Sequence, residues 1–281
     1  MNVLIAGCGD VGNALAALLL KNGHLVYGLK RDTSTLPKEV LAIKADLTNP
    51  DTLTGLPENI DTLVFMPTPG KRDQAAYEAI FHDGWRNLWN ALKQPSARTI
   101  LVSSTAVYGQ SDGSIVNEET AAEPSRFNGK ALLQMERLAA DCTGSLVVAR
   151  VSGIYGPGRE GMIRLATSKG LEVQKSPPVF TNRIHRDDVA AALMHLMLLD
   201  EPQDLYLVSD DLPVAKYDVL AWIAASLGNA VPKGLVSGQG SGGKRVSNKR
   251  LRGSGFRLKF PDYRSGYGSI LKLNQRHEQT R

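Results

Sequence analysis

The chain has 281 residues, of which 42% are hydrophobic, and this is enough to bury one large core or two modest ones. Its two cysteines, Cys8 and Cys142, exclude a disulfide framework and fit a reducing cytoplasm. The formal net charge of +5 is uneven, because residues 244–281 are strongly basic and the rest of the chain is net acidic. No apolar run is long enough for a membrane span, and Gly7 and Gly9 interrupt the N-terminal one, so we expect a cytoplasmic protein without a secretory signal.

The basic C-terminal segment, residues 244–281, holds eleven Lys/Arg and two Asp/Glu, a net charge of +9. It could bind an anionic substrate, a partner or nucleic acid, or it could be a solvated surface with a loose tail. We expect a small anionic or hydroxylated substrate rather than nucleic acid or a membrane, and a homodimer remains open. No cluster of His, Cys and Asp has metal-ligand spacing, so no metal is expected.

The first expected strand runs directly into a glycine turn and an Ala/Leu-rich helical stretch. Gly7, Gly9 and Gly12 form a G-x-G-x-x-G arrangement there, which predicts a dinucleotide site. Gly7 permits the tight turn, Gly9 lets the backbone approach a pyrophosphate, and Gly12 lets the helix pack closely on the strand. The phosphates would then lie at the positive end of the helix dipole, beside Asp10 and Val11. The alternative is a plain structural turn.

The second expected strand, residues 25–29, ends in the basic residues Lys30 and Arg31. In NAD-selective sites an acidic residue at the end of this strand accepts hydrogen bonds from the ribose 2′-hydroxyl. A basic strand end instead favours a 2′-phosphate, so the sequence favours NADP over NAD. The alternative is that both side chains are ordinary surface residues.

Strands and helices alternate along the first two thirds of the chain. This alternation predicts an α/β protein, with a Rossmann-type doubly wound parallel sheet of about seven strands and right-handed crossovers. The later strands are expected at residues 40–48, 61–66, 99–103, 146–151 and 205–208, and helices at 73–92 and 128–141.

The pattern loosens after the sixth expected strand. We expect a dinucleotide-binding domain of residues 1–155 plus 182–212, and a small discontinuous cap of residues 156–181 plus 213–281. Ligands of open α/β sheets bind at the carboxyl ends of the strands, where such a cap would lie. The Ser/Gly-rich stretch 237–243 is expected to be mobile.

Four segments carry a resemblance to a known family, and they occur in the family's order. Residues 103–109 read Ser-Ser-Thr-Ala-Val-Tyr-Gly, residues 150–158 end in Tyr-Gly-Pro-Gly, and residues 184–190 read Ile-His-Arg-Asp-Asp-Val-Ala. Asp46 and Leu47 fall where the family places an Asp beside the adenine ring. Together they resemble the NAD-dependent epimerase/dehydratase branch of the extended short-chain dehydrogenase/reductase superfamily.

The resemblance implies an NAD(P)-dependent enzyme for a small hydroxylated or nucleotide-sugar-like substrate. It places Ser104 and Thr105 as catalytic candidates and Tyr108 beside the substrate, although packing is the alternative for this tyrosine. Arg159, after the Gly-Pro-Gly turn, is a candidate for holding an anionic substrate group. Further cofactor contacts are expected from Asp46, Leu47, Met66, Pro67 and Ser103.

The glycine turn departs from the pattern of the extended family members, which have G-x-x-G-x-x-G. In that register this chain reads Ala6-x-x-Gly9-x-x-Gly12, with Gly7 as an offset glycine. A dinucleotide can still be held, but the departure indicates an atypical branch.

The catalytic pair of the family is the second departure. A Tyr-x-x-x-Lys pair normally exchanges a proton, because the lysine lowers the pKa of the tyrosine. Alignment on Glu136 puts Asn128 at the tyrosine position and Leu132 at the lysine position, and neither can do this chemistry. A dinucleotide-binding sensor or regulatory protein without turnover is therefore the alternative function. His185 is expected to be a structural residue at a helix start rather than a base.

Overall fold

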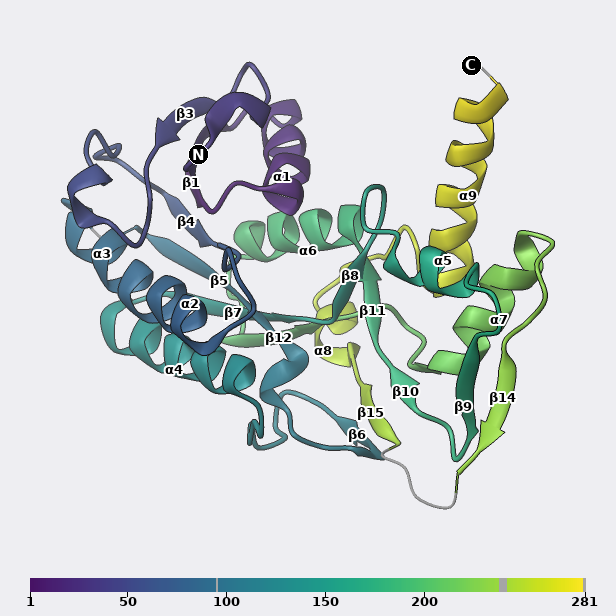
Figure 1. The fold of residues 1–281 in the computed structure, drawn as a ribbon. Coiled ribbons are helices and arrows are strands. Elements are labelled where there is room, and N and C mark those ends of the chain that lie inside the picture. Colours follow the sequence, from purple (N-terminus) through teal and green to yellow (C-terminus); the bar gives the residue numbers. More distant parts are fainter. Residues whose placement is uncertain (95, 238–241, 280–281) are drawn as a thin grey trace. The chain divides into compact units, whose positions relative to one another are not determined.

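The computed structural model describes residues 1–94, 96–237 and 242–279, and side chains up to residue 272 (Figure 1). Most of the Ser/Gly-rich stretch that was expected to be mobile therefore lies outside the described residues. The described chain forms two compact units. Unit 1 comprises residues 1–109, 121–150 and 189–206, and unit 2 comprises residues 110–120, 151–188 and 207–281.

A seven-stranded parallel sheet confirms the predicted α/β fold (Figure 1). Its order is β12-β7-β5-β4-β1-β2-β3, so the chain starts in the middle and builds outward in two directions. The strands β1 and β4 are almost wholly buried, as expected for apolar runs covered on both faces. The strands are β1 (Asn2–Ala6), β2 (Leu25–Lys30), β3 (Leu41–Lys44), β4 (Thr62–Phe65), β5 (Arg98–Ser104), β7 (Leu146–Val151) and β12 (Leu205–Val208).

The helix that follows β4 differs from the single helix that the sequence predicts. It consists of α2 (Gln74–Glu78), a π-helical turn η3 (Ala79–Asp83) and α3 (Gly84–Ala91). Phe81 and Trp85 are buried, and the Trp85 ring packs edge-on against Phe65 at 5.1 Å. These two aromatic side chains therefore belong to the core of unit 1, whereas Tyr77 and Trp89 are half-buried.

Three further helices follow the expected positions: α1 (Asp10–Lys21), α4 (Phe127–Cys142) and α6 (Arg186–Leu198). Short 3-10 turns lie in the connections after β2, β3 and β5. They are η1 (Thr33–Thr35), η2 (Pro50–Thr52) and η4 (Thr105–Val107). No helix among the described residues is long and apolar enough to cross a membrane.

Unit 2 contains pairs of short strands that the sequence does not predict. Its core lies between α7 (Lys216–Ser226) and α9 (Tyr263–Gln279), where Leu220, Ile223, Tyr267 and Ile270 are buried together. The strand pairs are β6 (Asp112–Val116) with β15 (Gly243–Val246), β8 (Gly153–Tyr155) with β11 (Arg183–His185), β9 (Glu172–Ser176) with β14 (Lys233–Val236), and β10 (Phe180–Thr181) with β13 (Val214–Ala215). The helices are α5 (Gly161–Ala166), α7 (Lys216–Ser226), α8 (Lys249–Gly253) and α9 (Tyr263–Gln279).

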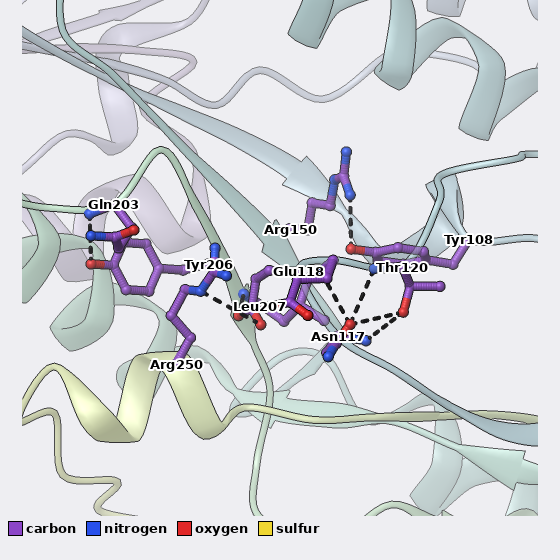
Figure 2. A network of polar contacts seen from close by, with 10 residues as sticks. Tyr108, Asn117, Glu118, Thr120, Arg150, Gln203, Tyr206, Leu207 and Arg250 are labelled. Carbon is purple, nitrogen blue, oxygen red and sulfur yellow. Dashed lines mark hydrogen bonds and ion pairs between the residues drawn. The ribbon is translucent and has the colours of Figure 1, made fainter.

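A side chain protects the end of the edge strand β12. The backbone N–H of Leu207 donates a hydrogen bond to Oε1 of Glu118 at 2.9 Å, and Arg250 lies 3.9 Å from the other carboxylate oxygen (Figure 2). The adjoining turn is closed by Asn117, whose Oδ1 accepts from the N–H and the hydroxyl of Thr120. An edge N–H bound in this way is not available to pair with another strand.

A glycine in the first turn of α4 sets how closely this helix packs in unit 1. A Cβ at Gly129 would lie 2.4 Å from the carbonyl oxygen of Ala106 and 2.7 Å from Cβ of Pro124. Helix propensity alone would make Gly129→Ala stabilising by about 1 kcal/mol. Because the clash involves backbone, the destabilisation from overpacking, about 1–3 kcal/mol, should outweigh that gain.

We expect Gly129→Ala to lower the midpoint of urea unfolding measured by circular dichroism. Gly161→Ala, at the start of α5, is the control, because nothing lies within 4 Å of its Cβ position. The control should unfold at the wild-type midpoint or slightly above it. A Gly129→Ala variant as stable as wild type would contradict the close packing.

Candidate functional site

A cleft of about 510 Å³ lies in unit 1, at the carboxyl ends of β1, β2 and β4. Its wall continues along the loop after β4 to the start of the helix α2–η3. The predicted cofactor residues that line it are Gly7, Gly9, Lys30, Arg31, Asp46, Leu47 and Pro67. The other predicted residues, Asp10, Val11, Gly12, Met66 and Ser103, are not among its lining residues.

The glycine turn adopts the geometry expected of each glycine. Gly7 has φ +88°, and a Cβ there would lie 2.5 Å from Cα of Pro67. A Cβ at Gly12 would lie 3.2 Å from Sγ of Cys8 in the turn and 3.4 Å from Cγ2 of Ile5 in β1, so helix and strand pack closely. At Gly9 the nearest atom is 3.9 Å away, so protein packing does not require glycine there. Open space at Gly9, which lines the cleft, fits a ligand that approaches the backbone.

The helix α1 begins directly at this glycine turn. Gly9 is its N-cap residue and provides no side-chain cap, and Asp10 is the acidic residue of its first turn. The N-terminus of a helix of this length carries partial positive charge and directs backbone N–H groups outward. The residues present therefore fit the pyrophosphate of a dinucleotide.

The end of β2 gives the cleft a basic wall. Lys30 donates a hydrogen bond to Oγ1 of Thr35 at 2.7 Å, and Arg31 extends to within 3.8 Å of the Cβ position of Gly70. Lys71, from the loop after β4, also lines the cleft and was not predicted. The sequence feature that could have identified Lys71 is the basic pair Lys71-Arg72. This pair follows Pro-Thr-Pro-Gly after β4, at the same edge of the sheet.

Asp46 and Asp32 are the acidic residues of this wall, and both are engaged with backbone. Asp32 caps η1 by accepting from the N–H of Ser34 at 3.0 Å. Asp46 accepts from the N–H and the hydroxyl of Thr48. Burial opposes ionisation of Asp46, but these bonds and the charge of Arg31 lower its pKa below the usual value. Both carboxylates therefore stabilise turns of the cleft.

The segment after β5 carries the catalytic candidates. Oγ of Ser104 is half-buried and accepts from the N–H of Ala106 at 3.2 Å, at the start of η4. The neighbouring Thr105 is buried, and the Ser103 hydroxyl donates to Glu136. Of the three hydroxyls, that of Ser104 is the least enclosed.

A buried ion pair joins α4 to β7 in unit 1. Arg150 contacts the Glu136 carboxylate through Nε and Nη2, the latter at 2.6 Å. Its Nη1 donates to the hydroxyl of Tyr108 at 2.7 Å (Figure 2). Tyr108 is only 2% exposed, so its hydroxyl belongs to this network. Removing one partner of such a pair costs about 3–5 kcal/mol.

On α4, Leu132 lies about one turn and Asn128 about two turns before Glu136 of this ion pair. Leu132 is buried, and Asn128 is half-buried. Neither side chain can supply the proton transfer of a Tyr/Lys pair. No group of three His, Cys, Asp or Glu side chains in the described chain could hold a metal ion.

Unit 2 holds the remaining candidates. Arg159 is exposed and lines a separate cavity of about 420 Å³. His185 is 2% exposed, and its Nδ1 accepts from the N–H of Asp187 at the start of α6. Its ring packs against Tyr155 and Phe260. This is the structural role that the sequence favoured.

Comparison with known proteins gives a consistent result. The profile of the NAD dependent epimerase/dehydratase family matches residues 3–208. A protein of Methylobacillus flagellatus, assigned as an NAD-dependent epimerase/dehydratase, shares 39% identity over 98% of each chain, with a TM-score of 0.84. MoeE5, in complex with UDP-glucose and NAD, shares 23% identity over 99% of each chain, with a TM-score of 0.80. Human epimerase family protein SDR39U1, with NADPH, shares 21% identity over 97% of this chain and 99% of its own, with a TM-score of 0.77.

None of the curated proteins compared with the chain matches it.

The sheet order and the glycine turn define a Rossmann-like protein of the short-chain dehydrogenase/reductase type. Within that class, the chain belongs to the NAD-dependent epimerase/dehydratase family.

The pKa of His185 makes the stability of the protein depend on pH. Burial lowers this pKa to about 4; the charge of Asp187 acts in the opposite direction, and the charges of Arg186 and Lys259 lower the pKa further. The unfolded chain, with a histidine pKa of about 6.5, binds more protons between these two values. Stability from this group is therefore complete above about pH 6.5 and is lost as the pH falls toward about 4, by about 1–3 kcal/mol.

We expect His185→Asn to remove this part of the pH dependence, because Asn can still accept from the N–H of Asp187 but does not titrate. The measurement is urea unfolding at several pH values from 4 to 8. The variant should lose less stability than wild type on acidification, whatever its stability at pH 8. If the free energy of unfolding changed with pH by the same amount in both proteins, His185 would not be a buried neutral group with a lowered pKa.

Proposed function

We propose that this protein is an NADP-dependent oxidoreductase or epimerase/dehydratase for a small hydroxylated or nucleotide-sugar-like substrate. The observation that carries the proposal is the cleft of unit 1, where an open glycine position and an uncapped helix start share a wall with Lys30 and Arg31. The bound dinucleotide would accept or donate hydride. We also propose that the protein acts in the cytoplasm, in keeping with its two unpaired cysteines.

The preference for NADP rests on the charge of the cleft wall. Lys30, Arg31 and Lys71 contribute three cations, whereas the carboxylates of Asp32 and Asp46 accept hydrogen bonds from neighbouring turns. Arginine binds phosphate through two parallel hydrogen bonds, so Arg31 suits a 2′-phosphate. The cofactor differs between the two neighbours described above: the structure of SDR39U1 contains NADPH and that of MoeE5 contains NAD.

Proton transfer in the proposed reaction needs a group other than the Tyr/Lys pair. We assign it to Ser104, acting through a water molecule, with Thr105 beside it. The hydroxyl of Ser104 is held at the start of η4 by one hydrogen bond that it accepts, so its proton stays available for donation. Arg159 is a separate candidate, for binding an anionic group of the substrate rather than for proton transfer.

A specific observation also supports a non-catalytic sensor or regulatory protein. Leu132, which the alignment on Glu136 puts at the position of the catalytic lysine, is a buried apolar side chain and cannot act as a cation. Such a protein would keep the dinucleotide cleft and lose the chemistry. Turnover distinguishes the two functions, since both require the same cofactor site.

We expect the purified protein to bind NADPH more tightly than NADH in a titration followed by nucleotide fluorescence. Lys30→Ala and Arg31→Ala should each weaken NADPH binding roughly 10–100-fold, the loss of one charge-assisted hydrogen bond, with little effect on NADH. Lys44→Ala is the matched control, because Lys44 ends the neighbouring strand β3 without lining the cleft. Equal affinity for both nucleotides would overturn the NADP preference, and binding of neither would make the glycine turn purely structural.

We expect Ser104→Ala to abolish turnover while NADPH binding stays at the wild-type level. The substrates to screen are alcohols, ketones and nucleotide sugars, with nicotinamide absorbance as the readout. Ser125→Ala, an exposed serine of the same unit, should remain active. Unchanged turnover in Ser104→Ala would remove this residue from the mechanism. Cofactor binding without turnover of any substrate by wild type would favour the sensor.

A further inference from the structure

The cleft of unit 1 has an apolar wall in addition to its basic one. Two segments that are distant in sequence form this apolar wall: the turn after β3 and the helix α2–η3 after β4. The residues that they contribute are Ala45, Leu47, Ala76, Ala79 and Ile80. A mostly apolar surface beside a few polar groups is the usual lining of a site for a small molecule with an aromatic ring. Under the proposed function, this wall receives the adenine ring.

The helix side of the apolar wall contains the π-helical turn η3. Ala79 is the first residue of this turn, and the N–H of Gly84 closes it by donating to the carbonyl oxygen of Ala79. Turns of this kind are rare and occur frequently at functional sites. Ala79 and Ile80 both belong to the turn and line the cleft, so the irregular part of the helix borders the site.

The two sides of the apolar wall meet at Gly84. A Cβ at this buried position would lie 3.2 Å from Cβ of Leu47 and 3.7 Å from Cδ1 of Ile80. The first distance is shorter than an ordinary van der Waals contact between carbon atoms. The turn after β3 therefore packs directly against the helix backbone where the π-helical turn ends.

A hydrogen bond from Asn87 joins the same two segments. Nδ2 of Asn87 donates to the carbonyl oxygen of Leu47 at 2.9 Å. The turn is closed internally by other bonds, since Oγ1 of Thr52 accepts from the N–H of Asp46 at 2.9 Å, and Asp46 accepts from the N–H of Thr48. These internal bonds fix the shape of the turn, whereas the bond from Asn87 fixes its distance from the helix.

Asn87 acts from outside the cleft. Its side chain is half-buried and is not among the lining residues, whereas Leu47 is. Any effect of Asn87 on a ligand is therefore transmitted through Leu47. The spacing matters because dispersion attraction is short-ranged, and a gap of about 0.5–1 Å already removes roughly a quarter to a half of it.

We propose that Asn87 is a positioning residue of the dinucleotide cleft. By binding the carbonyl oxygen of Leu47, it holds the turn after β3 at the distance from the π-helical turn at which the apolar wall packs against the adenine ring. The inference rests on the proposed function, because it requires a dinucleotide in this cleft. It assigns a role to a side chain that touches neither the cofactor nor the substrate.

Isothermal titration calorimetry on the full chain tests the proposal. The probes are NADPH with its adenylate half 2′,5′-ADP, and NADH with its adenylate half 5′-AMP, so the test does not depend on which dinucleotide is preferred. Asn87→Leu keeps a similar shape but has no donor. It should weaken binding of the preferred dinucleotide and of its adenylate half by the same factor, about 3–10-fold, as expected for one neutral hydrogen bond.

Asn90→Leu is the matched control, because Asn90 is an exposed asparagine of the same helix that does not line the cleft. It should bind all probes as wild type does. Wild-type affinity in Asn87→Leu, or equal losses in Asn87→Leu and Asn90→Leu, would overturn the proposal. A loss for the dinucleotide without a loss for its adenylate half would also overturn it, since the effect would then lie away from the adenine ring.

Two further variants separate positioning from a merely structural role, with circular dichroism to verify folding. Asn87→Gln keeps an amide donor and should bind more tightly than Asn87→Leu. Asn87→Asp matches Asn in size, but its carboxylate cannot donate and would oppose the carbonyl oxygen of Leu47. It should therefore bind more weakly than Asn87→Gln. Equal affinities in Asn87→Gln and Asn87→Asp would show that the donated hydrogen bond does not matter.

The wild-type titration distinguishes failure of this inference from failure of the proposed function. If wild type binds a dinucleotide and the Asn87 variants bind it equally well, the positioning role is wrong and the proposed function stands. If wild type binds none of the four nucleotides, both are wrong.

Discussion

The close approach of two chain segments at Gly7 determines the geometry of unit 1. Because Gly7 lacks a Cβ, the end of β1 meets Pro67 after β4, and the N–H groups of Gly7 and Cys8 both donate to the carbonyl of Leu29. Three neighbouring strands are thus joined at their carboxyl ends by one turn. The floor of the cleft, the start of α1 and the basic wall after β2 all take their positions from this junction.

A buried ion pair anchors the helix α4 in unit 1. Glu136 and Arg150 form a buried pair that also engages Ser103 and Tyr108, so the helix is fixed against β5 and β7. Leu132, one turn before Glu136 on the same helix, is buried and carries no titratable group. The ion pair therefore anchors α4 without a contribution from a titratable side chain at that position.

Much of unit 1 was predictable from sequence because its signals are local. Buried parallel strands read as continuous apolar runs, and the glycines of the first turn identify the cleft. The π-helical turn was not predictable, since one helical periodicity covers residues 73–92. The strand pairs of unit 2 are two to five residues long and pair across distant parts of the chain, so they leave no periodic signal. Lys71 and Asn87 were missed for a related reason, because only the tertiary fold brings Lys71 to the cleft and Asn87 to Leu47.

The division of the two cavities between two compact units has an evolutionary consequence. Substitutions around Lys216 or Arg159 alter a wall that includes no residue of the dinucleotide cleft, and substitutions at Arg31 leave the cavity of unit 2 untouched. The two walls share no lining residue, so a substitution in one changes no residue of the other. Selection can therefore alter the lining of one cavity by single substitutions while the lining of the other stays as it was.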